Sequence, residues 1–294
     1  MDTFSTEFPF TQFQIEGSKR VTLFAKTLGP QEAKTKIVIL HDLLDYHRCY
    51  IELGTSLYKK FGKDSQIIWI DLRGHGLSTG NRFTCSSFDD YCLDTIEVLN
   101  QLTSDQDHVV LLGQGLGGLV SLRIVQNHFQ RLKAIPSHMI LSNPLLRLKM
   151  EPPIFGRTMM EHIAGAFGKV FMPIDFEARM LTHNPQKSEI FAKDPLIGKR
   201  ITYGLYQEIL RISHHVRQEV YYINIPCMLL IGNKDQIADS ETTKLFAKGL
   251  MEGNSFTKTY QDGEHDLFND ICHDDSLDQL YDWIKGKNHE NLSL

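Results

Sequence analysis

Short apolar runs alternate along the chain with longer stretches in which apolar residues recur every three or four positions. Three of the runs, 36–41, 66–71 and 109–113, are continuous and rich in β-branched residues or leucine. Such runs are typical of parallel strands that are buried on both faces. Residues 10–27 alternate about a Gly17 turn and predict an antiparallel hairpin. Further strands are expected at 139–141, 227–231 and 256–260.

The stretches between these runs predict helices. One helix is expected after Ser86 and Ser87, which are candidate N-caps. A second follows Gly115 and is apolar on most sides. The last helix carries a single apolar stripe and ends near 285–286; the stripe consists of Leu277, Leu280, Tyr281 and Ile284. Strands that alternate with helices predict an α/β fold with a mostly parallel sheet, which the chain enters through the hairpin.

The strand pattern stops after residue 150 and resumes after 218. We therefore predict an α/β core formed by 1–150 and 219–294, with 151–218 as a helical lid over the carboxyl ends of the strands. The lid opens with two prolines and is rich in Met and Phe. These apolar residues form the lid's own small core, or part of them lines an acyl-chain pocket or contacts membrane, and both can hold on opposite faces. They are Met159, Met160, Ile163, Phe167, Val170, Phe171 and Met172.

Composition narrows the range of functions. The chain has 31 basic and 36 acidic residues, a formal charge of −5. This balance argues against a sequence-independent nucleic-acid binder. A basic leader and an apolar run of roughly 18 residues are both missing from the sequence, which favours a cytoplasmic protein, with peripheral membrane contact through the lid as an addition. Five scattered cysteines without CxxC spacing predict reduced thiols, and we expect no metal and no cofactor.

The first candidate catalytic segment lies at the end of the run 109–113. Here Gly113, Gln114, Gly115, Leu116 and Gly117 separate a predicted strand from a predicted helix. A strand, a glycine-framed turn and a helix form a nucleophile elbow, which normally has the pattern Gly-x-Ser-x-Gly. The serine position is taken by a glycine, which has no hydroxyl. The flanking glycines serve the tight turn, and Gln114 is expected to pack beside it.

Two further residues suit serine hydrolysis in the chain order that an elbow requires. Asp235 follows the predicted strand 227–231, where a carboxylate can orient an imidazole. His265 follows the last predicted strand and would be the general base.

Several motifs together make a specific resemblance. Residues 71–80 fit the pattern DxRGHGxSxG without a gap, and 142–144, 194–196 and 265–269 also match. From about residue 15 to 286 the chain resembles the monoacylglycerol lipases and lysophospholipases of the α/β-hydrolase superfamily. The resemblance implies an apolar pocket for an acyl lipid or a small ester. It also implies that the backbone amides of Leu43 and Leu116 form the oxyanion hole.

Two departures from the family pattern fall in the site. Gly115 replaces the nucleophilic serine, and Asp42 replaces the glycine that follows His41 in the oxyanion loop. A carboxylate at Asp42 would lie beside the oxygen that becomes negative during acyl transfer. In a poorly hydrated pocket this repulsion costs on the order of kcal/mol, so transition-state stabilisation should suffer. His41 is expected to support the loop.

Three explanations of Gly115 remain. A single laboratory inactivation leaves Asp42 unexplained, whereas natural loss of the nucleophile explains both departures. Altered chemistry would use a water molecule in the space that the missing side chain leaves near His265, or Asp42 as a nucleophile or second base, although Asp42 lies on the wrong loop for such an attack. We predict a catalytically inactive or severely impaired protein with a lipid-binding or regulatory role; the alternative is an ester or lipid hydrolase.

Overall fold

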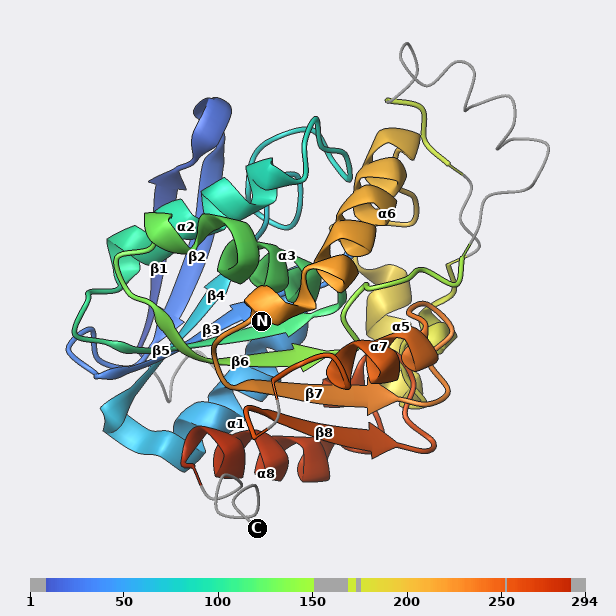
Figure 1. Cartoon of the computed structure of the whole chain (residues 1–294). Helices are drawn as coiled ribbons and strands as arrows, with labels where there is room; N and C mark the ends of the chain where they lie inside the picture. The colour runs from blue at the N-terminus through green and yellow to red at the C-terminus, as the bar shows by residue number, and fades with distance from the viewer. Residues whose placement is uncertain (1–8, 151–168, 173–175, 252, 287–294) are drawn as a thin grey trace.

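The computed structural model describes residues 9–150, 169–172, 176–251 and 253–286. An eight-stranded sheet with the order β1-β2-β4-β3-β5-β6-β7-β8 forms its centre (Figure 1). β2 pairs antiparallel with both β1 and β4, and all other neighbours are parallel. The predicted α/β fold with an N-terminal hairpin is therefore confirmed. The strands are β1 (Phe10–Glu16), β2 (Thr22–Leu28), β3 (Thr35–Leu40), β4 (Ser65–Ile70), β5 (His108–Gln114), β6 (Pro136–Ser142), β7 (Cys227–Gly232) and β8 (Ser255–Tyr260).

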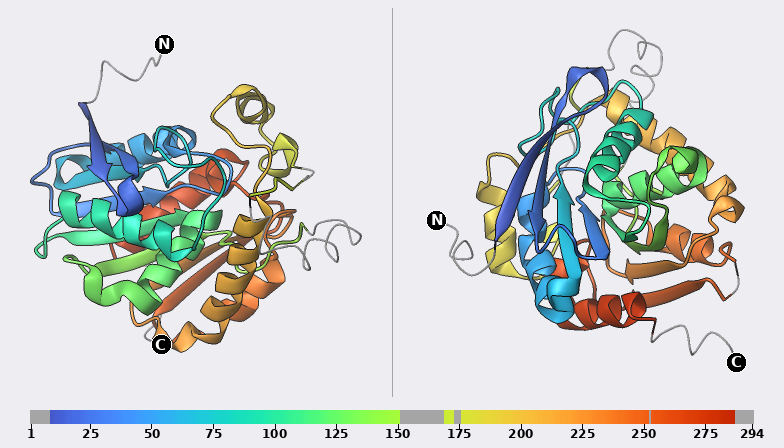
Figure 2. Two further views of the ribbon diagram at one scale, coloured as in Figure 1. Left: turned by 90° about the horizontal axis from the view of Figure 1, so that it is seen from above. Right: turned by 90° about the vertical axis from the view of Figure 1, so that its left-hand side faces the viewer.

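The central strands are buried on both faces because successive side chains enter two different cores. In β3, Val38 and Leu40 belong to one apolar cluster, whereas Ile37 and Ile39 belong to another. Helices cover both clusters, and Figure 2 shows the sheet between the two helical layers. α1 and α8 contact each other on one face, and α2 packs against α3 on the other. The helices are α1 (Ile51–Phe61), α2 (Asp89–Leu102), α3 (Gly115–Arg123), α5 (Pro185–Lys193), α6 (Tyr203–Gln218), α7 (Ser240–Ala247) and α8 (His273–Ile284).

The predicted cap of α2 is wrong. Its N-cap is Phe88, and no side chain at that position closes the helix. The Phe88 amide instead donates to Glu208 Oε2 of α6, at 2.7 Å. A carboxylate from a distant segment thus satisfies one amide at the positive end of the helix. This contact joins α6 to the core.

The described part of the predicted lid consists of α5, α6 and the segments beside them. Figure 1 places α5 on the side toward which β6 and β7 point, as expected for a lid. α6 packs against α3. Met172 is buried, whereas Val170 and Phe171 are exposed. The prolines and the other apolar residues named for the lid lie outside the described residues, so the domain boundaries remain predictions. None of the described helices combines the length and apolar character needed to cross a membrane.

Candidate active site

The elbow lies where β5 meets α3. Gly115 begins α3 with φ +48°, in the left-handed region that side-chain-bearing residues seldom adopt. At Gly113 a Cβ atom would lie 2.5 Å from the carbonyl oxygen of Gly117, so the strand and the helix approach too closely for a side chain. The backbone is that of a nucleophile elbow, with no side chain at its apex.

The predicted acid and base meet in the structure. Asp235 Oδ2 accepts a hydrogen bond from His265 Nδ1 at 2.7 Å. The other oxygen of Asp235 accepts from the amides of Ile237 and Ala238. Both Asp235 and His265 are buried. This pair has the geometry that orients the imidazole in a catalytic triad.

Two side-chain amides hold the backbone of His265. Its carbonyl oxygen accepts from Gln114 Nε2 at 2.7 Å and from Asn143 Nδ2 at 2.8 Å. Gln114 was expected only to pack beside the elbow. Its hydrogen bond also ties the elbow to the histidine loop. Asn143 belongs to the 142–144 motif, so that motif serves the same purpose.

Asp42 reaches into the centre of the site from the end of β3. Its Oδ1 accepts a hydrogen bond from the Leu116 amide at 2.7 Å, and its Oδ2 lies 2.8 Å from His265 Nε2. One of the two predicted oxyanion donors, the Leu116 amide, thus binds the Asp42 carboxylate, which occupies this part of the hole rather than only lying beside it.

The carboxylate also fills the space at the apex of the elbow. A Cβ atom built on Gly115 would lie 1.7 Å from Asp42 Oδ1. The prediction that the missing side chain leaves space for a water molecule beside His265 is therefore wrong. Asp42 belongs to another loop, as expected, but its carboxylate reaches the place where an elbow side chain would begin.

Opposite charges stabilise the contacts of His265 with Asp42 and Asp235. Burial alone would lower the pKa of His265, but the carboxylates of Asp235 and Asp42 outweigh it and raise the pKa well above 6.5. Burial likewise opposes ionisation of Asp42, but the charge and hydrogen bond of His265 lower the pKa of this carboxyl group. Both ring nitrogens lie within hydrogen-bonding distance of a carboxylate, and the raised pKa favours the imidazolium form, in which both nitrogens donate and no lone pair is left to act as a base.

Two acidic residues near the site were not identified from the sequence. Burial raises the pKa of Asp266 to about 7, with a further contribution from Asp45. Burial also raises the pKa of Asp45, although its carboxyl group accepts from the Tyr50 hydroxyl at 2.6 Å. Their positions were visible in the sequence, because Asp266 follows His265 and Asp45 lies four residues after His41. Both groups add to the acidic surroundings of His265.

Two further segments named from the sequence, His41 and the 71–80 motif, play structural roles. His41 Nδ1 lies 2.6 Å from the Asp42 carbonyl oxygen, and His41 Nε2 accepts from the Leu72 amide, so His41 supports the oxyanion loop as predicted. In the 71–80 motif, Arg73 donates to both carboxylate oxygens of Asp94, on α2. The motif therefore joins the loop after β4 to α2.

The structure also bears on metal binding and thiol state. All five cysteines are free, in agreement with the predicted thiols. Within the described residues Asp89, Cys92 and His128 bring potential ligand atoms within 4.8 Å of one another. Burial raises the pKa of the Cys92 thiol well above 9, however, and Asp89 already pairs with Arg123 and His128. A protonated thiol and a carboxylate that is already paired make a poor ligand set for a metal.

Known proteins are similar to the chain over most of its length. The monoglyceride lipase of Rattus norvegicus is 24% identical over 249 residues, which cover 81% of this chain and 77% of that protein. Phospholipase YtpA of Bacillus subtilis is 24% identical over 238 residues, or 80% of this chain and 88% of its own.

Solved structures show the same fold. The monoacylglycerol lipase of Paleococcus ferrophilus superimposes with a TM-score of 0.76 at 19% identity, covering 95% of this chain and 98% of that one. A soluble variant of the monoglyceride lipase of Saccharomyces cerevisiae also gives 0.76, at 14% identity, and covers 97% of each chain.

A family model described as serine aminopeptidase, S33, matches residues 31–271. This range runs from the segment before β3 to beyond the histidine loop, so it includes the elbow, Asp42, Asp235 and His265. The chain is a monoacylglycerol lipase-like α/β-hydrolase by fold and belongs to the serine aminopeptidase S33 family.

Proposed function

We propose that this protein is a catalytically inactive or severely impaired member of its family, and that it binds an acyl lipid as a binding or regulatory protein. One observation carries the proposal of inactivity. The Asp42 carboxylate binds the Leu116 amide and His265 Nε2 at once. The oxyanion donor and the base are therefore both engaged, and the elbow supplies no hydroxyl.

The same contacts favour natural loss of the nucleophile over a single laboratory change. A side chain at position 115 would overlap with Asp42 Oδ1. An active enzyme with serine at this position would therefore need a different placement of the Asp42 side chain. Glycine at 115 and aspartate at 42 fit each other, as expected for two changes that were retained together.

An apolar cavity supports the proposed lipid binding. It has a volume of about 550 Å³ and lies between the lid helix α5, the first two strands and the loop after β3. Its apolar lining includes Phe10, Phe24, Leu77, Ile190 and Phe191. Charged side chains also line it, namely Lys26, Arg48, Glu52, Lys187 and Asp194. Leu77 and Ile190 are more than half exposed, at 54% and 57%. Asp42, Gly115 and His265 do not contribute to the lining described, so an acyl chain could bind there while the reaction site stays closed.

Inactivity is tested directly with the purified protein. We expect no labelling by a fluorophosphonate probe and no turnover of p-nitrophenyl esters or monoacylglycerol above a His265→Ala control. Loss of the nucleophile and of the free base each removes a step that ester hydrolysis needs. Turnover that depends on His265 would contradict the proposal.

Lipid binding is tested separately with a fluorescent fatty acid and with monoacylglycerol. We expect Ile190→Glu to weaken binding about tenfold or more, because a carboxylate would replace an apolar side chain in the part of the lining that an acyl chain would contact. Leu245→Glu is the matched control, since Leu245 is 70% exposed on α7 and does not line this cavity. Equal affinities of the two variants would contradict the proposed lipid site, whatever the outcome of the activity assay.

A further inference from the structure

A second cavity lies apart from the reaction site, and its lining is cationic. It has a volume of about 840 Å³ and opens between the β1–β2 turn, the loop before α2 and the start of α6. Four basic side chains line it, Lys19, Arg20, Arg73 and Lys169, and one acidic side chain, Glu208. In a chain with a net charge of −5, such a concentration of cations marks a local site for an anion.

Two of these cations are available to a ligand. Lys19 pairs with Asp90 and Arg73 with Asp94, whereas the side chains of Arg20 and Lys169 have no hydrogen-bonding or ion-pair partner among the described residues. The single acidic group is already neutralised, because Glu208 accepts from Arg211 and from the Phe88 amide. With respect to the described residues, the cavity therefore presents positive charge that no acidic side chain offsets.

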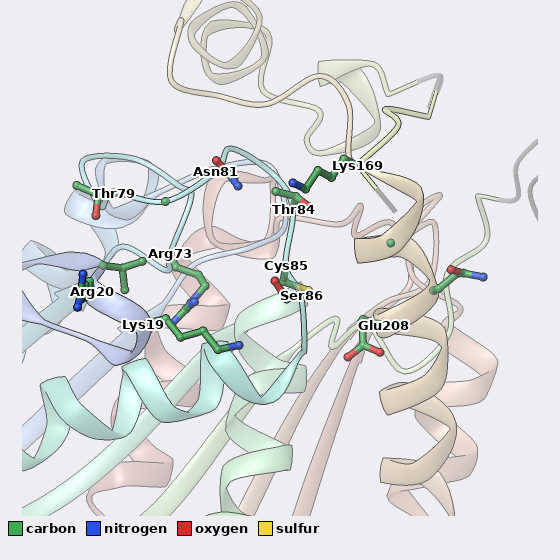
Figure 3. A pocket seen from close by; sticks show the side chains of 14 residues that line it. Lys19, Arg20, Arg73, Thr79, Asn81, Thr84, Cys85, Ser86, Lys169 and Glu208 are labelled. Atoms are coloured by element: carbon green, nitrogen blue, oxygen red, sulfur yellow. The ribbon is translucent and has the colours of Figure 1, made fainter. Parts of the chain in front are cut away.

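The floor of the cavity is fixed. Arg73 is 8% exposed, and its guanidinium group is held by both carboxylate oxygens of Asp94 and by the Ser18 hydroxyl. In Figure 3, Lys19 and Arg20 lie on one side of the hollow, Lys169 lies on the other, and Arg73 lies nearer to the first pair. A ligand that engages both sides must carry negative charge at more than one position.

The turn that supplies Lys19 and Arg20 has an unfavourable backbone conformation. Lys19 and Arg20 have φ values of 56° and 61°, although neither is glycine. Left-handed geometry is unfavourable for residues that carry a Cβ atom. The turn is held in place by the Ser18 amide, which donates to Asp94, and by Lys19 Nζ, which donates to Asp90. Retained strain of this kind is frequent at binding sites.

We propose that this cavity binds a phosphate-bearing anion with its charge spread over more than one group, such as a diphosphate or the phosphorylated headgroup of a lipid. Arg20 and Lys169 are the residues that bind it, and hydroxyl and amide groups such as those of Ser86 and Asn81 are available to donate to its oxygens. This inference is independent of the proposed function, because none of the residues concerned belongs to the reaction site.

Calorimetric titration of the full chain with pyrophosphate, and flotation with phosphatidylcholine vesicles that contain or lack phosphatidic acid, test the proposal. We expect saturable binding that weakens with salt, and Arg20→Ala/Lys169→Ala should weaken it about tenfold or more. The matched control is Arg131→Ala/Lys248→Ala, which removes the same charge from two exposed residues outside the cavity.

Each outcome of these experiments supports or overturns the proposed anion site. Binding of pyrophosphate that only the first variant loses supports the site and a soluble ligand. Binding only of vesicles with phosphatidic acid, lost in the same variant, supports the site and a lipid headgroup. Absence of binding to either probe, or an equal effect of both variants, overturns the proposal. Unfolding midpoints close to that of the parent would show that the variants are folded.

Discussion

The double variant Gly115→Ser/Asp42→Gly is expected to hydrolyse p-nitrophenyl esters, whereas neither single variant should do so. The serine supplies the nucleophile, and removal of Asp42 frees the Leu116 amide and His265 Nε2. The Asp235–His265 pair and the left-handed elbow backbone are already present. Removing a triad serine or histidine typically lowers kcat by a factor on the order of 10⁶. We therefore expect a partial recovery, on the order of 10³-fold in kcat/KM over the single variants.

The single variants separate the two effects. Gly115→Ser alone should stay inactive, because its Cβ atom would overlap with Asp42 Oδ1 and the base would remain paired. Asp42→Gly alone lacks a nucleophile. Gly115→Ala/Asp42→Gly is the matched control, since it introduces the same backbone strain without a hydroxyl. Full activity of Gly115→Ser alone would show that Asp42 does not block the site.

The second large effect is expected from Asp42→Asn, which retains the shape of the side chain but removes its charge. One of the two carboxylates that raise the pKa of His265 is then lost, so this pKa should fall. A hydrogen bond to a charged group contributes about 1.5–3 kcal/mol, and we expect a loss of similar size in the free energy of unfolding near pH 6. Urea unfolding from acid to alkaline pH measures it, with the exposed Asp105→Asn as a control.

The pH dependence has a definite sign. Because folding raises the pKa of His265, its contribution to stability is complete below the unfolded value of about 6.5, and it is lost as pH rises through the folded value. Because folding lowers the pKa of Asp42, its contribution is present above about 3.9 and is lost as pH falls through the folded value. The difference in the free energy of unfolding between the parent and Asp42→Asn should be largest between about pH 3.9 and about pH 6.5. A constant difference across the whole range would contradict the coupling.

The fold was largely predictable from the chain itself. Runs such as 36–41 and 109–113 are continuous because both faces of β3 and β5 are covered by helices. The chain order of elbow, Asp235 and His265 likewise predicted which residues meet. The cap of α2 could not be predicted, because the carboxylate that closes it comes from Glu208, 120 positions away.

The role of Asp42 was predictable only in part. Its position beside the oxyanion loop followed from the motif, and repulsion of a negative oxygen followed from its charge. The salt bridge to His265 depends on the orientation of the Asp42 side chain. The two residues lie 223 positions apart in the sequence. The glycine at 115 permits that orientation, since any larger residue would overlap with the carboxylate. The two departures from the family pattern are therefore one structural feature.

The most direct test of this account is the protonation state of His265 in the unmodified protein. Nitrogen-15 NMR of the imidazole distinguishes a ring with two N–H groups from a ring with one. We predict that His265 carries protons on both nitrogens at neutral pH and keeps them well above pH 6.5, and that Asp42→Asn shifts its titration to lower pH. A neutral His265 at pH 7 with a bare Nε2, unchanged in Asp42→Asn, would contradict the claim that Asp42 closes the site.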